Sequence, residues 1–179
     1  MLAAGVALLS LVAAATLQAK LYQGHAKELL RNEIQTAIVS KVVGLNAQIK
    51  EDDVLGRLDI PRIGISVAVL QGTGSRTLRL GVGHIESTSF PGDSGNVGIA
   101  GHRDTFFRAL RDIRKHDEIQ LQTATRLFHY QVDWIKVVTP GDVSVLAPST
   151  ESALTLVTCY PFQFVGAAPQ RFIVRAHKY

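Results

Sequence analysis

Cysteine is almost absent from this 179-residue chain, because Cys159 is the only one. An internal disulfide requires two cysteines, and a zinc site built from thiolates requires several, so the sequence excludes both. Aromatic residues make up only 7% of the chain, and Gly and Pro, at 15 and 6 residues, show no biased tracts. This composition excludes disulfide scaffolds, collagen-like chains and long coiled coils. With 46% hydrophobic positions, the chain can form one folded domain with appendages.

Positive charge is in small excess, and it is unevenly distributed. The formal net charge is +4, of which residues 1–50 carry +3 and residues 51–179 only +1. The basic cluster between Arg103 and Lys115 is offset by acidic residues within it and just beyond it. Such runs usually form a solvated surface. We therefore expect no nucleic-acid partner.

The segment Leu2–Ala19 contains no formally charged residue and consists mainly of Leu, Ala and Val. A helix of about 20 such residues can cross a bilayer. We predict a membrane-spanning signal anchor over residues 1–19. A cleavable signal peptide and a buried core helix are the alternatives. No Lys or Arg precedes the run, so charge does not fix its orientation.

An amphipathic pattern follows the apolar run. Apolar residues recur at intervals of three or four, which predicts a helix from about Leu21 to Ile49. The recurring positions are Leu30, Ile34, Ile38, Val42, Leu45 and Ile49. Glu51, Asp52 and Asp53 then end the pattern. We interpret residues 20–50 as a helical linker and residues 51–179 as the folded domain.

From residue 51 onward, short β-branched runs alternate with Gly, Pro, Asp and Asn, which is typical of an all-β barrel or sandwich. A short helix is expected at Phe106–Leu110, and loops at Gly81–Gly95 and Tyr160–Gln170. The predicted strands are Val54–Ile60, Ile65–Leu70, Asn96–Gly101, Glu118–Thr123, Arg126–Val138, Ala153–Thr158 and Arg171–Ala176.

Cys159 and His102 each lie at the end of a predicted buried strand, and Arg171 begins another. Strand ends can converge on a rigid rim, where a thiol with a neighbouring base can act as a nucleophile. Lone cysteines are also often inert core residues. His84 is the competing histidine, and the spacing of His84 and His102 gives no reason to expect a metal site.

Two motifs and one arginine make the pattern more specific. Residues 154–161 read LTLVTCYP, residues 98–105 read GIAGHRDT, and Arg171 leads the last strand. In this order they resemble the sortase family of cysteine transpeptidases, and the Thr-Cys-Tyr-Pro form most resembles class D-like and Gram-negative sortases. The resemblance spans about Val54 to Tyr179. It implies a closed eight-stranded β-barrel in an extracytoplasmic domain, tethered to the cell membrane by a single N-terminal helix.

The resemblance also implies site roles. Cys159 would be the nucleophile, His102 the general acid and base, and Arg171 a donor to the oxyanion or the substrate backbone. Thr158 and Tyr160 would contact the substrate. That substrate would be a protein with a Leu-Pro-x-Thr-Gly-like sorting signal, cleaved between Thr and Gly through a thioester and transferred to an amine acceptor on peptidoglycan or protein.

Two other functions remain open on the residues alone. A hydrolytic cysteine peptidase would share the nucleophile and the base, and a membrane-tethered β-domain that only binds peptides would keep Cys159 inert. No cofactor motif is present, so none of the three functions calls for a cofactor.

Overall fold

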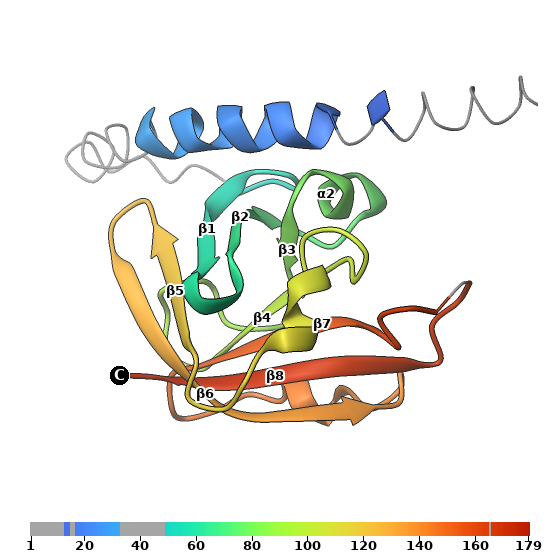
Figure 1. The fold of residues 1–179 in the computed structure, drawn as a ribbon. Coiled ribbons are helices and arrows are strands. Elements are labelled where there is room, and N and C mark those ends of the chain that lie inside the picture. Colours follow the sequence, from blue (N-terminus) through green and yellow to red (C-terminus); the bar gives the residue numbers. More distant parts are fainter. Residues whose placement is uncertain (1–12, 15–16, 33–48, 165) are drawn as a thin grey trace, which may run out of the picture.

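The structure, a computed structural model, describes residues 13–14, 17–32, 49–164 and 166–179. An N-terminal helix (residues 17–32) precedes a β-rich domain with one short α-helix and three 3₁₀ turns (Figure 1). The elements of this domain are β1 (Val54–Ile60), η1 (Pro61–Ile63), β2 (Ile65–Gln71), α2 (Ser75–Leu80), β3 (Val82–His84), β4 (Asn96–Gly101), η2 (Arg108–Asp112), β5 (Glu118–Thr123), β6 (Leu127–Val138), η3 (Val143–Leu146), β7 (Ala153–Tyr160) and β8 (Gln170–Lys178).

The strands close into a barrel in the order β1-β2-β3-β4-β7-β8-β6-β5. Two neighbouring pairs, β2–β3 and β4–β7, are parallel, and the other pairs are antiparallel. This confirms the predicted closed eight-stranded all-β fold. The predicted strands at Val54–Ile60, Asn96–Gly101 and Glu118–Thr123 have the observed limits, and the others differ by a few residues at their ends.

Two local predictions were wrong. The segment predicted as the loop Gly81–Gly95 contains β3, which the sequence did not reveal because it is only three residues long and includes Gly83. The helix expected at Phe106–Leu110 is instead the 3₁₀ turn η2, since Phe106 and Phe107 lie in the preceding turn. Helix α2 was not predicted, because six residues are too few to show a helical period.

The barrel core forms because apolar side chains alternate along the strands. In β1, for example, every second residue is buried, and Leu58 and Ile60 are fully enclosed. On β7, Leu154 and Leu156 belong to the same cluster, as do Val97 and Ile99 on β4. Because side chains alternate along a strand, the residues between these core positions on β4 and β7 face outward.

The N-terminal helix lies across the outside of the barrel, over β1 and β2 (Figure 1). Its Ala26 and Leu30 join a second apolar cluster with Ala68 and Leu80. Of the predicted 21–49 helix, residues 21–32 are helical, whereas Ile49, the other described residue of that range, is not. Residues 33–48 lie outside the described residues, as does most of the predicted membrane segment. None of the described helices combines the length and apolar character needed to cross a bilayer.

Candidate active site

Strands β4, β7 and β8 lie side by side in the barrel, and their ends bring together residues that are far apart in the chain. In the parallel β4–β7 pair, Gly101 lies opposite Thr158, so the next residue of each strand, His102 and Cys159, follows at the same end. In the antiparallel β7–β8 pair, Cys159 lies opposite Arg171. The strand ends therefore place the thiol between a histidine and an arginine.

The alternation of side chains assigns these three residues to the outer face of the barrel. Leu154 and Leu156 point into the core, so Val157 and Cys159 on the same strand point outward. Cys159 is half-buried, whereas His102 is exposed. A partly exposed thiol beside an imidazole fits a nucleophile better than an inert core cysteine.

His102 is held in place through its backbone. Its carbonyl oxygen accepts a hydrogen bond from the Phe107 N–H group (3.0 Å), and the Phe107 ring is fully buried in the core. No hydrogen bond joins the side chains of His102 and Cys159 in the part of the chain that the structure describes. Catalytic hydrogen bonds are often long before the substrate binds, so this arrangement is compatible with an acid–base role.

The Thr158 side chain lies on the inner face of β7, opposite to that of Cys159, and is only 2% exposed. Its hydroxyl donates a hydrogen bond to the carbonyl oxygen of Gly101 (2.7 Å). This bond ties β7 to β4 at the residues that immediately precede Cys159 and His102. The geometry gives Thr158 a positioning role, and its predicted contact with substrate stays a prediction.

Tyr160 follows Cys159 on β7 and so points to the opposite face of the strand, where it belongs to an aromatic cluster. Its ring stacks on Phe172 at a centroid distance of 6.1 Å and meets the edge of Phe162 at 5.9 Å. All three rings are half-buried. Phe162 and Phe172 pack against the barrel core, so the cluster supports the end of β7 from its inner side, and the predicted contact of Tyr160 with substrate stays a prediction.

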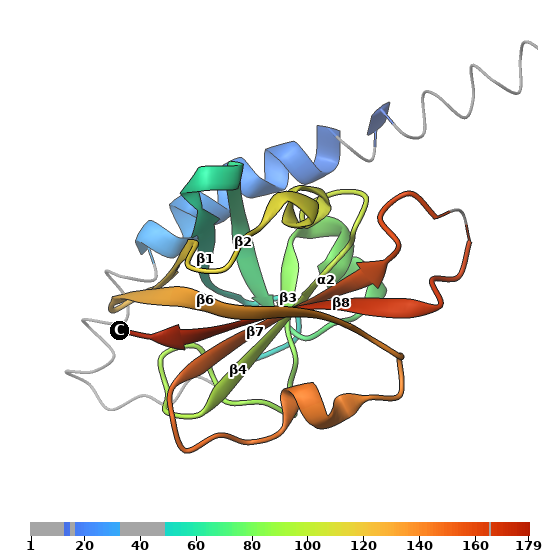
Figure 2. The same ribbon diagram turned by 60° about the horizontal axis from the view of Figure 1, so that its bottom comes forward.

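Two arginines contact the loop between β7 and β8, which projects from the barrel (Figure 2). Arg171 donates from Nη1 to the carbonyl oxygens of Gln170 (2.9 Å) and Ala168 (3.2 Å). Arg103 donates from Nη2 to the carbonyl oxygens of Phe164 (2.6 Å) and Gly166 (3.3 Å). The sequence prediction did not single out Arg103 as a site residue, although it directly follows His102.

His84, the competing histidine, is fully buried and structural. Its Nε2 lies 2.9 Å from the carbonyl oxygen of Ser89, and its Nδ1 lies 3.0 Å from the side-chain oxygen of Gln71. Its ring packs against Phe90 with centroids 4.8 Å apart. Burial lowers the pKa of His84 below its ordinary value. A buried histidine with both nitrogens engaged is not available to a substrate.

A closed barrel that presents a thiol, an imidazole and a guanidinium at adjoining strand ends contains the groups required for cysteine-dependent acyl transfer. Comparison with known proteins narrows this class further. A family model described as the sortase domain matches residues 58–179. The chain belongs to the sortase family.

Individual relatives agree with this assignment. Sortase D of Bacillus subtilis is 37% identical over 120 residues, an alignment that covers 66% of this chain and 61% of that protein. Sortase A of Listeria monocytogenes is 28% identical over 130 residues, covering 70% of this chain and 58% of the relative. The chain thus spans about three fifths of the length of these relatives.

Solved structures show the same fold. A structure described as a Clostridium perfringens sortase D5 transpeptidase has a TM-score of 0.72 at 30% identity, covering 89% of this chain and 97% of that one. A pilus-related sortase C of Group B Streptococcus has a TM-score of 0.67 at 30% identity, covering 75% of both chains. The likeness to sortase D in both comparisons supports a class D-like sortase.

Proposed function

We propose that this protein is a cysteine transpeptidase that cleaves a Leu-Pro-x-Thr-Gly-like sorting signal between Thr and Gly and transfers the acyl part to an amine. The observation that carries the proposal is the pairing of Cys159 with Arg171 across β7 and β8, with His102 at the adjoining end of β4. Membership of the sortase family supports it.

The first half-reaction forms a thioester. The Cys159 sulfur, as a thiolate, attacks the carbonyl carbon of the threonine, and the C–N bond to glycine breaks. His102 as imidazolium gives its proton to the departing glycine amine. The second half-reaction reverses these roles: His102 accepts a proton from the incoming amine, which attacks the thioester and releases the Cys159 sulfur.

Arg171 stabilises the negative charge that forms on the carbonyl oxygen. One of its terminal nitrogens, Nη1, already donates to the Ala168 and Gln170 carbonyl oxygens, which fixes the plane of the guanidinium. Within the described residues, Nε and Nη2 make no hydrogen bond, so their donors remain for the substrate. A preorganised donor of this kind needs no rearrangement when the charge develops.

The tether is a second part of the proposal. The uncharged run Leu2–Ala19 is long enough to anchor the chain in the cell membrane, with the barrel on the extracytoplasmic side. The sorting-signal protein and the amine acceptor would then meet the active site near the membrane surface.

The test is mass spectrometry of the full chain in detergent micelles, incubated with a Leu-Pro-x-Thr-Gly peptide with and without a small primary amine. We expect an acyl adduct on Cys159 and an amine-capped peptide, and neither in Cys159→Ala. Capped product from Cys159→Ala would contradict the mechanism. An acid product alone, even with excess amine, would instead favour the hydrolytic peptidase.

The peptide-binding alternative has its own readout. If the domain only binds peptides, Cys159 should react slowly with a thiol reagent and form no adduct. In a transpeptidase, the thiol should react, and the sorting peptide should protect it.

A further inference from the structure

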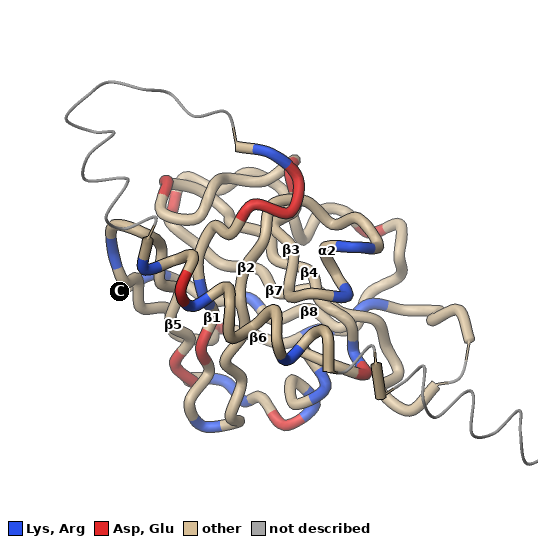
Figure 3. Tube along the Cα trace, turned by 90° about the horizontal axis from the view of Figure 1, so that it is seen from above, with Lys and Arg blue, Asp and Glu red and all other residues tan. Residues whose placement is uncertain are grey.

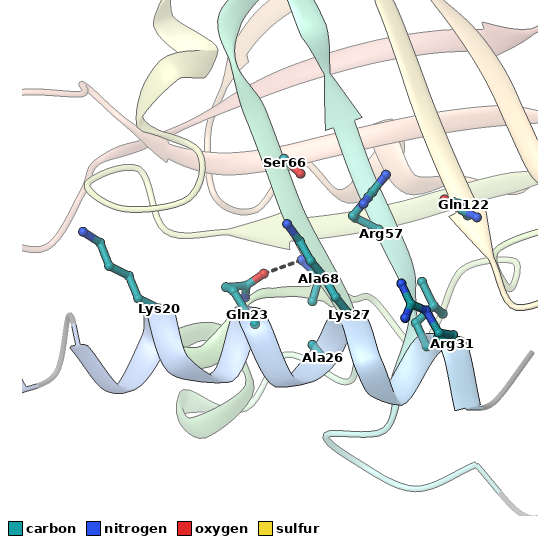
Figure 4. A pocket seen from close by; sticks show the side chains of 12 residues that line it. Lys20, Gln23, Ala26, Lys27, Arg31, Arg57, Ser66, Ala68 and Gln122 are labelled. Carbon is teal, nitrogen blue, oxygen red and sulfur yellow. Dashed lines mark hydrogen bonds between the residues drawn. The ribbon is translucent and has the colours of Figure 1, made fainter.

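A groove separates the N-terminal helix from the barrel, on the side formed by β1, β2 and β5. The cavity has a volume of about 540 Å³. Figure 4 shows the side chains that line it. Three helix residues, Lys20, Lys27 and Arg31, line it together with Arg57 from β1. No Asp or Glu is among the described residues that line it. The groove is therefore basic.

The helix is fixed in the orientation that directs these cations toward the strands. The Gln23 side chain accepts a hydrogen bond from the Ala68 N–H group (2.8 Å) and donates to the carbonyl oxygen of Leu80. Residues 20, 23, 27 and 31 are spaced three, four and four apart and so share one helix face. Figure 4 shows Lys27 and Arg31 extending from this face toward the strands, and Lys20 at the end of the groove.

Among the described residues, three of the four cations of the groove have no counter-ion. Lys20, Lys27 and Arg31 form no ion pair within the described residues. Arg57 is paired with Asp59 only through Nε (2.8 Å), which leaves its terminal nitrogens free. Elsewhere on the barrel, acidic and basic residues are interspersed (Figure 3). Like charges gathered without a partner repel one another, so an anion bound between them would relieve that repulsion.

The chemistry of the groove favours a phosphate group. A guanidinium presents a fork of donors that matches phosphate oxygens, and lysine ammonium groups add mobile point charges. Arg57 on β1 and Arg31 on the helix supply the guanidinium forks, and Lys20 and Lys27 supply the ammonium groups.

The position of the groove indicates where that phosphate comes from. Lys20 is the first charged residue after the uncharged run Leu2–Ala19. Because a helix rises 1.5 Å per residue, the cations from Lys20 to Arg31 are spread over roughly 16 Å along the helix axis, starting where that run ends. The polar layer on each side of a bilayer is about 5–8 Å deep. Lys20 would lie within this layer, so the groove begins among the headgroups.

We propose that this basic groove binds the phosphate of an anionic phospholipid headgroup and holds the barrel against the membrane surface. The inference rests on the membrane tether of the proposed function, and it adds a lipid site that is separate from the active site.

The test measures the acetylation rate of individual lysines by mass spectrometry, with the full chain in nonionic detergent micelles. The micelles are doped with phosphatidylglycerol or with zwitterionic phosphatidylcholine, and a third sample contains inorganic pyrophosphate. We expect phosphatidylglycerol to slow acetylation of Lys20 and Lys27 but not of Lys115 or Lys178. In the variant K27Q/R31Q, the lipid concentration that half-protects Lys20 should rise about 30-fold. This is the loss of affinity expected when two basic residues stop contributing to membrane binding.

The variant R114Q/K115Q is the matched control, because it removes the same charge from an exposed turn outside the groove. It should protect Lys20 like the wild type. Equal slowing of all lysines, equal effects of both double variants, or no protection would overturn the proposal. Protection by pyrophosphate without protection by phosphatidylglycerol would overturn the lipid assignment. Thioester formation at Cys159 is followed in the same samples, so failure of the proposed function is seen separately.

Discussion

Cys159 and Arg171 lie directly opposite each other in the β7–β8 ladder, although eleven residues separate them in the chain. Residues opposite each other on antiparallel strands have Cβ atoms about 5 Å apart. The pairing holds because the ladder continues without a shift from Ala153 opposite His177 to Tyr160 opposite Gln170. The Cys159 thiol and the Arg171 guanidinium are thus brought together by the barrel itself rather than by a loop.

We predict that Arg171→Lys lowers the rate of thioester formation about 100-fold, the typical cost of losing one oxyanion donor. Lysine keeps the charge but cannot hold the Ala168 and Gln170 carbonyl oxygens while also donating to the substrate in a fixed plane. Stopped-flow or quench-flow measurement of acylation checks this. Arg126→Lys, on the exposed start of the β6 hairpin, is the control and should acylate normally.

The two histidines should respond in opposite ways to substitution. His102→Ala should fold normally, because the side chain is exposed, and should lose acyl transfer by at least about 100-fold. His84→Ala removes a buried ring and its hydrogen bonds, so we expect it to lower the free energy of unfolding by about 2–4 kcal/mol. The acylation rate per folded molecule should nevertheless stay close to wild type. The reverse ranking would show that His84 is the catalytic histidine.

Burial of His84 also predicts a pH dependence of stability. Its pKa is lowered in the folded state, so as the pH falls below about 6.5 the unfolded chain takes up a proton that the folded chain does not. The stabilising contribution is complete above that pH and is lost as the pH falls toward the lowered folded pKa. Urea unfolding at pH 7.5 and 5.5 should show a larger loss in the wild type than in His84→Gln. Equal losses would contradict the prediction.

The sequence predicted much of this fold because most strands bear a clear physical signature. Residues 97–101 are β-branched or small apolar residues, and residues 153–158 combine Ala and Leu with β-branched Thr and Val. The two runs form the adjacent strands β4 and β7. Their order in the barrel was not predictable from periodicity. A parallel pair separated by more than fifty residues depends on the whole barrel closing, and only that closure places His102 beside Cys159.

Contacts made by single side chains were also beyond sequence patterns. The Gln23 side chain bonds the N–H group of Ala68 and the carbonyl oxygen of Leu80. Both residues lie just before the point where β2 and β3 begin to pair. Nothing in the amphipathic pattern marks Gln23, because the period identifies apolar positions only. The basic groove follows from this docking, so it too required the structure.

Gly101 gives a fourth prediction, about how β4 positions His102. A Cβ atom at this residue would lie 2.7 Å from the Phe107 ring and 2.8 Å from Val82, both in the barrel core. Gly101→Ala should therefore cost about 1–3 kcal/mol in unfolding free energy. It should also slow acylation, since the strand end that carries His102 must shift. Gly141→Ala, where a Cβ meets nothing within 4 Å, is the control.

Arg103 should position the β7–β8 loop for the substrate. Its guanidinium donates to the Phe164 and Gly166 carbonyl oxygens and lies 5.9 Å from the centre of the Phe164 ring. Losing charged hydrogen bonds of this kind should raise KM for the sorting peptide about tenfold in Arg103→Gln. Because Arg103 makes no contact with Cys159 among the described residues, kcat should change by less than about threefold at the same energy scale. Steady-state kinetics separates the two constants, with the exposed Arg108→Gln as control. A fall in kcat with unchanged KM would place Arg103 in the chemical step instead of the loop.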